Sequence, residues 1–138
     1  MRDTSEGGES WLELNAWGLR SRSVPKRLAD KARFVAFSMR LVKISVNPPV
    51  YVYLGENGDH VLVDSAYCSC DGFLRRISDG LVEGCSHVYA VRLAEESGRV
   101  RLAILSPEEV GLVVWEVLTG GLTRTLRRKL LLERRGGD

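Results

Sequence analysis

The cysteines constrain this chain more than any other feature of its sequence. All three cysteines and one of the two histidines fall within twenty residues, as Cys68-x-Cys70, fourteen intervening residues, then Cys85-x-His87. Three thiolates and one imidazole make a complete tetrahedral ligand set for zinc. An odd number of clustered cysteines is typical of metal ligation in a reducing compartment, and not of a secreted disulfide framework. The spacing therefore predicts one structural Zn²⁺ bound by Cys68, Cys70, Cys85 and His87.

Three other interpretations of these residues stay open. Free cysteines are often buried as small inert hydrophobes, Cys68 with Cys70 could form a redox pair, and Cys85 with His87 could form a catalytic dyad. No nucleophile motif surrounds Cys85, and four protein ligands leave no coordination position for a catalytic water. No acid/base constellation lies elsewhere in the sequence. We therefore expect a protein that is not an enzyme and has no small-molecule substrate.

One helix and three strands are predicted before the first ligand pair. The helix starts at Pro25, a residue well suited to a first turn, and its apolar residues recur at helical spacing: Leu28, Ala32, Val35 and Met39. Alternation predicts a strand over residues 42–46. Two further strands, 50–54 and 60–64, flank a loop with strong turn chemistry at 55–59. These strands should form an antiparallel meander that leads to Cys68.

Three more elements are predicted after the second ligand pair. Residues 85–97 form a helix that Gly98 ends, and residues 100–104 alternate as a strand. Ser106-Pro107-Glu108-Glu109 has the signature of a helix start, and this helix should reach about Leu118 with Trp115 in the core. A basic helix follows over 122–135.

The expected fold class is a small α+β domain, with an antiparallel sheet, a zinc-stapled ββα module and flanking helices. We divide the chain into a disordered acidic start over residues 1–10, a body over 11–105, and C-terminal helices with a basic tail over 106–135. The body contains the zinc module at about 50–97.

The residues around both ligand pairs resemble the SWIM zinc finger. Tyr67-Cys68-Ser69-Cys70-Asp71-Gly72-Phe73 and Cys85-Ser86-His87-Val88-Tyr89-Ala90-Val91 follow its pattern of Cys-x-Cys, a variable spacer and Cys-x-His. An aromatic residue after the second cysteine and a small-apolar helix after the histidine also agree. The resemblance implies a strand-strand-helix zinc module and the four ligand roles. SWIM modules occur in bacterial and archaeal proteins, transposases, ubiquitin ligases, and recombination mediators that pair with RecA-like paralogues.

Positive charge is concentrated in two segments, although the net charge is only +2. Residues 20–43 carry a net charge of +7, residues 122–135 carry +5, and residues 1–13 carry −3. Two basic segments predict a polyanionic partner, while a solvated helix face is the simpler explanation of each. We predict Phe73 as core and His60 as an exposed hairpin residue. The predicted nucleic-acid contacts are Lys26, Arg27, Lys31, Arg75, Arg76, Arg124, Arg127, Arg128, Lys129, Arg134 and Arg135.

The leading functional hypothesis is a non-enzymatic protein that binds nucleic acid, either DNA or structured RNA in a ribonucleoprotein such as the ribosome. The alternative is a protein adapter of the recombination-mediator type that partners a RecA-like paralogue through apolar helix faces and residues 11–17. No signal peptide or membrane span is evident, which predicts a cytoplasmic protein. The absence of glutamine and the sixteen arginines against four lysines suit a thermophilic prokaryote, such as an archaeon.

Overall fold

The structure is a computed structural model that describes residues 10–11, 23–24, 26–78 and 85–136. Along the described chain the elements are β1 (Ser10–Trp11), β2 (Ser23–Val24), α1 (Lys26–Ala36), β3 (Leu41–Val46), β4 (Pro49–Leu54), β5 (Asp59–Val63), β6 (Tyr67–Cys68), α2 (Asp71–Ser78), α3 (Ser86–Ser97), β7 (Arg101–Leu102), α4 (Pro107–Gly120) and α5 (Arg124–Gly136). β1 and β2 pair as a separate antiparallel ribbon. Of the start predicted to be disordered over 1–10 and the apolar segment over 11–17, only Ser10 and Trp11 lie within the described chain, where they form β1.

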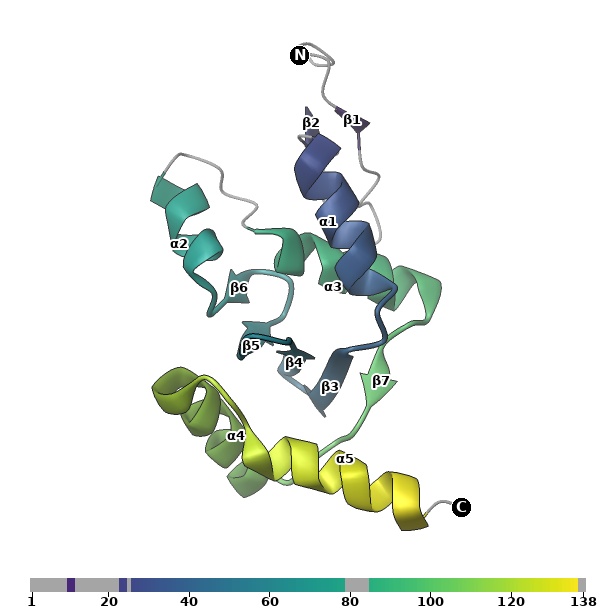
Figure 1. Cartoon of the computed structure of the whole chain (residues 1–138), viewed down its shortest axis with the longest axis vertical. Helices are drawn as coiled ribbons and strands as arrows, with labels where there is room; N and C mark the ends of the chain where they lie inside the picture. The colour runs from purple at the N-terminus through teal and green to yellow at the C-terminus, as the bar shows by residue number, and fades with distance from the viewer. Residues whose placement is uncertain (1–9, 12–22, 25, 79–84, 137–138) are drawn as a thin grey trace.

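A five-stranded sheet crosses the middle of the molecule in the order β6-β5-β4-β3-β7 (Figure 1). The predicted meander of β3, β4 and β5 is confirmed, and β6 joins β5 in the antiparallel sense. β7 differs because it runs parallel to β3. The α+β fold is therefore confirmed, with a sheet that is antiparallel except at one edge.

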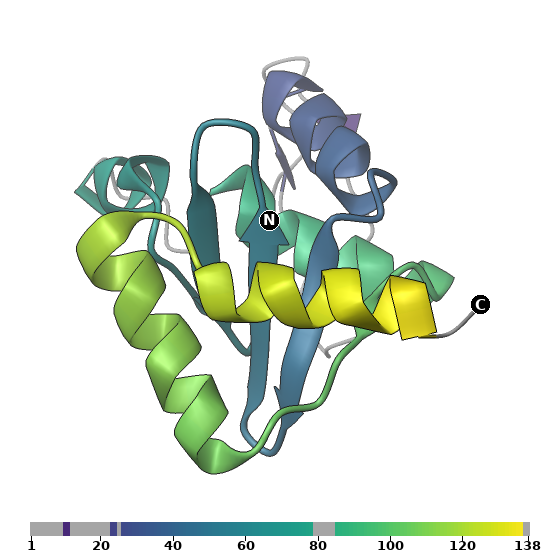
Figure 2. The same cartoon turned by 60° about the horizontal axis from the view of Figure 1, so that its bottom comes forward.

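Helices cover both faces of this sheet (Figure 2). α1 and α3 pack on the face that carries Leu41, Tyr51 and Leu62. α4 and α5 pack on the opposite face, where Val42 and Val52 are buried. Consecutive strand residues point to opposite faces, so a sheet with two cores buries both members of a pair such as Leu41 and Val42.

The strand predicted at 100–104 is shorter than expected, and its faces are reversed. Leu102 and Ile104 are exposed, whereas Ala103 and Leu105 are buried. The amides of Ala103 and Leu105 donate to the carbonyls of Lys43 and Ile44, which keeps the chain beside β3 beyond β7. This pairing directs Ala103 and Leu105 toward α4 and α5.

Two further predictions about apolar residues are wrong. α1 ends at Ala36, and Met39 follows in a left-handed conformation with a φ of 63° and half of its surface exposed. Trp115 is 62% exposed, because the buried residues of α4 are Val113 and Val117 and the residue midway between them lies on the opposite side of the helix.

The predicted start of α4 is confirmed in detail. Ser106 Oγ accepts the amide of Glu109 at 3.2 Å, and the Glu109 carboxylate accepts the amide of Ser106 at 3.1 Å. Both bonds satisfy helix-start amides that lack intrahelical partners. α4 ends before Gly121, which has a φ of 75°. Among the described residues, no helix combines the length and apolar character that a bilayer crossing requires.

Candidate metal centre

The four predicted ligand residues come together where β6, α2 and α3 meet. Cys68 ends β6, Cys70 immediately precedes α2, Cys85 is the N-cap of α3, and His87 lies in the first turn of α3. One ligand atom from each of these residues lies within 4.8 Å of every other. The structure therefore confirms that two ligand pairs distant in sequence form a single candidate metal centre.

Ser69 fixes the turn between the first two cysteines. Its hydroxyl accepts the amide of Val61 on β5, and its own amide donates to the carbonyl of Val61, both at 2.9 Å. The amide of Phe73 then donates to the carbonyl of Cys70, which begins α2. This short helix was not predicted, because the residues between the ligand pairs were treated as a spacer. Phe73 is buried, as predicted, with its ring against Tyr67.

The start of α3 presents the other two ligands. Cys85 has an extended backbone, and its carbonyl accepts the amides of Val88 and Tyr89. The Cys85 side chain makes no capping hydrogen bond, so its sulfur is available to a metal. The unpaired amides of a helix N-terminus favour a thiolate at this position.

The geometry is compatible with one tetrahedral metal ion, because all four ligand atoms lie within 4.8 Å of one another. Zn–S bonds of about 2.3 Å and Zn–N bonds of about 2.0–2.1 Å imply S···S and S···N separations of about 3.8 and 3.6 Å. Cys85 Sγ lies 3.7 Å from His87 Nδ1. All three cysteines are buried and His87 is partly buried. Soft thiolate ligands favour zinc over magnesium or calcium.

The four groups compete for protons, an arrangement compatible with a bound cation. Hydrogen bonds from the thiols of Cys68 and Cys85 place the pKa of Cys70 far below its ordinary value. The pKa of Cys68 is raised because this thiol is held as a hydrogen-bond partner of Cys70. Burial lowers the pKa of His87, but hydrogen bonds to Cys70 and Cys85 outweigh burial and raise it to about 9. A divalent ion removes this competition because it replaces the protons that the four groups share.

Two aromatic neighbours of His87 were missed at the sequence level. Tyr53 of β4 faces His60 of β5 directly across the hairpin. The centroid of the His87 ring lies 5.0 Å from the ring centroid of Tyr53 and 4.9 Å from that of His60. The prediction that His60 is exposed is wrong, because the ring of His87, in the first turn of α3, lies against it and His60 is half-buried. The tight turn at 55–58 fixes this register, so the pairing of Tyr53 with His60 was a signal available in the sequence.

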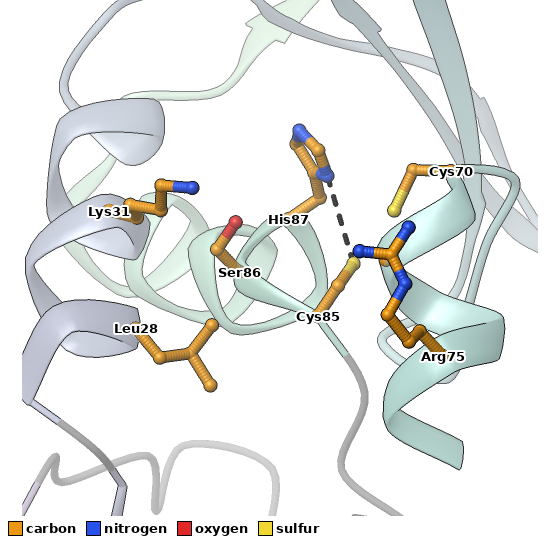
Figure 3. A pocket seen from close by; sticks show the side chains of 8 residues that line it. Leu28, Lys31, Cys70, Arg75, Cys85, Ser86 and His87 are labelled. Carbon is orange, nitrogen blue, oxygen red and sulfur yellow. Dashed lines mark hydrogen bonds between the residues drawn. The ribbon is translucent and has the colours of Figure 1, made fainter. Parts of the chain in front are cut away.

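Two predicted nucleic-acid contacts lie beside the metal centre. Lys31 of α1 and Arg75 of α2 line the same pocket as Cys70, Cys85 and His87 (Figure 3). Arg27 is exposed one helical turn before Lys31. Lys26 is also exposed, but its ammonium lies 3.2 Å from the carboxylate of Asp30.

The basic residues of α5 have a different environment. Arg127 pairs with the buried Asp59, and Lys129 lies 3.2 Å from Glu109. Arg124 and Arg128 are exposed. The side chains of the remaining predicted contacts lie outside the described structure: Arg76, Arg134 and Arg135.

Comparisons with protein-family models, with curated proteins and with solved structures found no match to this chain. The Cys₃His cluster is compatible with a zinc finger and could hold one metal ion. Any function assigned to the protein therefore depends on this cluster and on the surface around it.

Proposed function

We propose that this protein is a non-enzymatic zinc-binding protein of the SWIM type, which binds nucleic acid through the face that carries the metal centre. The observation that carries the proposal is the convergence of Lys31 and Arg75, from two separate helices, on a pocket in which no described residue supplies a carboxylate. Exposed cations without neighbouring acids attract the phosphate backbone of DNA or RNA.

The arrangement of the helices favours one face as the nucleic-acid contact. This is the face covered by α1 and α3, which carries the metal centre and is called the zinc side below; α5 lies on the other face. α1 and α3 cover one face of the sheet, whereas α4 and α5 cover the other (Figure 1). The two basic segments therefore do not form one continuous surface. α5 uses Arg127 and Lys129 in ion pairs, while Arg27, Lys31 and Arg75 make no ion pair with any described residue.

The metal has a structural role in this proposal. Four protein ligands complete the coordination of zinc, and no open position is left for chemistry. The ion would tie the end of β6 and the start of α2 to the start of α3. It would thereby hold Arg75 opposite Lys31 of α1, which packs against α3.

Removing the zinc-side cations is expected to weaken binding and to reduce its salt dependence. Each lost phosphate contact should lower the slope of log K against log salt by about 0.7–0.9. In the triple variant Arg27→Ala, Lys31→Ala and Arg75→Ala, the magnitude of this slope should therefore be smaller by about 2–3. Fluorescence anisotropy with duplex DNA, single-stranded DNA and structured RNA, each across a salt series, measures this.

The matched control is the double variant Arg124→Ala and Arg128→Ala, which removes exposed cations from the opposite face. It should leave both affinity and slope nearly unchanged. If the wild-type protein binds none of the three nucleic acids at low salt, the proposal is wrong. If only the control variant loses binding, α5 and not the zinc side is the contact surface.

A second candidate function, a protein adapter, is favoured by the outer face of α4. Leu112, Trp115 and Leu118 recur at helical spacing and are 45%, 62% and 56% exposed. An apolar stripe of this kind is typical of a helix face that packs against another protein. The resemblance to SWIM proteins suggests a RecA-like paralogue as the partner.

The adapter hypothesis predicts that Trp115→Glu abolishes recovery of a stoichiometric partner from nuclease-treated native extract. Because Trp115 is largely exposed, the substitution should leave the melting temperature close to that of the wild type. Phe34→Glu, at an exposed aromatic residue on α1, is the matched control and should retain the partner. Recovery of the partner by Trp115→Glu would exclude the α4 face as the contact.

A further inference from the structure

A pocket of about 330 Å³ opens beside the metal centre, between α1, α2 and the start of α3 (Figure 3). Cys70, Cys85 and His87 form part of its wall. Lys31 and Arg75 extend toward it from two sides, and Ser86 lies near the His87 backbone. A zinc ion with ligand bonds of about 2.0–2.3 Å would fill only a small part of this volume.

The charges around the pocket favour an anion. Three thiolates and one Zn²⁺ carry a formal charge of −1, and Lys31 and Arg75 change the local charge to +1. Among the described residues no carboxylate lines the pocket, and neither cation makes an ion pair with any of them. The described lining of the pocket would therefore retain positive charge after a zinc ion binds.

The donors also suit a tetrahedral oxyanion. The guanidinium of Arg75 offers a planar set of N–H donors, the ammonium of Lys31 offers a compact charge, and the hydroxyl of Ser86 offers one donor. Hydrogen bonds from charged donors to phosphate oxygens are stronger than those between neutral groups. Leu28 supplies an apolar wall on the α1 side, which limits access of water to that side.

We propose that this pocket binds one phosphate group, held by Lys31, Arg75 and Ser86. The inference rests on the proposed function for the source of the phosphate, which is a nucleic-acid strand. Inorganic phosphate presents the same chemistry and serves as the simplest probe. The volume of the pocket is near the lower end of the range for small-molecule sites. It accommodates one phosphate with its sugar and excludes a duplex.

The test uses the full chain loaded with zinc. Titration calorimetry with inorganic phosphate should show one saturable site, and Lys31→Ala or Arg75→Ala should weaken it about 10–100-fold. Lys26→Ala removes an exposed lysine of the same helix that does not line the pocket, and should leave phosphate affinity unchanged. A single-stranded oligonucleotide with a 5′-phosphate should compete with inorganic phosphate, and the same strand with a 5′-hydroxyl should compete less well.

Zinc content is measured for each variant, because Lys31 and Arg75 could instead balance the negative charge of the metal centre. Lower zinc retention with unchanged phosphate affinity would assign them that role and overturn the proposal. Absence of saturable phosphate binding by the wild type would also overturn it. If the protein binds the oligonucleotide but not inorganic phosphate, the proposed function stands and the phosphate pocket is rejected. If it binds inorganic phosphate but no oligonucleotide, the proposed function is rejected and the phosphate pocket stands.

Discussion

Chelation of the metal is expected to lower the free energy of unfolding by at least about 5 kcal/mol, because structural zinc sites bind with about 10–16 kcal/mol in zinc-finger peptides. A domain of ordinary stability has only about 5–15 kcal/mol in total. Without the ion, three buried cysteines and a partly buried histidine remain crowded within 4.8 Å. The junction of β6, α2 and α3 would then lack the cross-link that the four ligands supply. Circular dichroism during thermal unfolding, with and without chelator, measures the change.

The small number of cysteines and histidines allows the metal centre to be tested residue by residue. All three cysteines belong to the cluster, so a thiol reagent should find none reactive in the native protein and three after chelation. The two histidines provide a matched pair, because His87 belongs to the candidate ligand set and His60 lies beside it outside that set. His87→Ala and Cys85→Ser should lose zinc, whereas His60→Ala should retain it. Elemental analysis that finds no stoichiometric metal, or wild-type stability in Cys85→Ser, would contradict the metal centre.

The ligand set could be predicted from the sequence because its signal is local. Each ligand pair spans three residues, and a Cys-x-Cys turn or a helix N-cap presents its side chains whatever the rest of the chain does. The same holds for the capping box at Ser106 and for the turn of the β4–β5 hairpin, because consecutive residues determine each of them. Local rules of this kind do not require knowledge of the partner surface.

The incorrect predictions concern features that the packing of distant residues decides. The alternation at 100–104 fits either face, and contact with β3 selects the face of Ala103 and Leu105. Trp115, at the middle of the predicted helix, was expected in the core, yet α4 buries Val113 and Val117. The polyanion contact predicted from the charge of α5 stays a prediction, but the surroundings of Arg127 likewise depend on a distant residue, because this side chain pairs with the buried Asp59.

Arg127→Met is expected to destabilise the protein by about 2–4 kcal/mol, since it leaves the carboxylate of Asp59 buried without its counter-charge. The Asp59 side chain is completely buried, and it accepts hydrogen bonds from Arg127 Nε at 3.1 Å and from the amide of Thr123 at 2.9 Å. Arg127 also donates to the carbonyl of Gly55 at 3.2 Å. Breaking a fully buried pair costs about 3–5 kcal/mol, and the partial exposure of Arg127 lowers the expected value. Urea unfolding measures it.

Arg128→Met is the matched control, because Arg128 is the next residue of α5 and is exposed. Its effect should stay within about 0.5 kcal/mol. The double variant Asp59→Asn and Arg127→Met should be less unstable than the sum of its single variants, since removing both charges leaves no isolated ion in the hairpin turn. Additive effects would show that the two side chains are not coupled. Equal effects of Arg127→Met and Arg128→Met would show that the ion pair does not join α5 to the β4–β5 hairpin, and Arg127 would again be available as a phosphate contact.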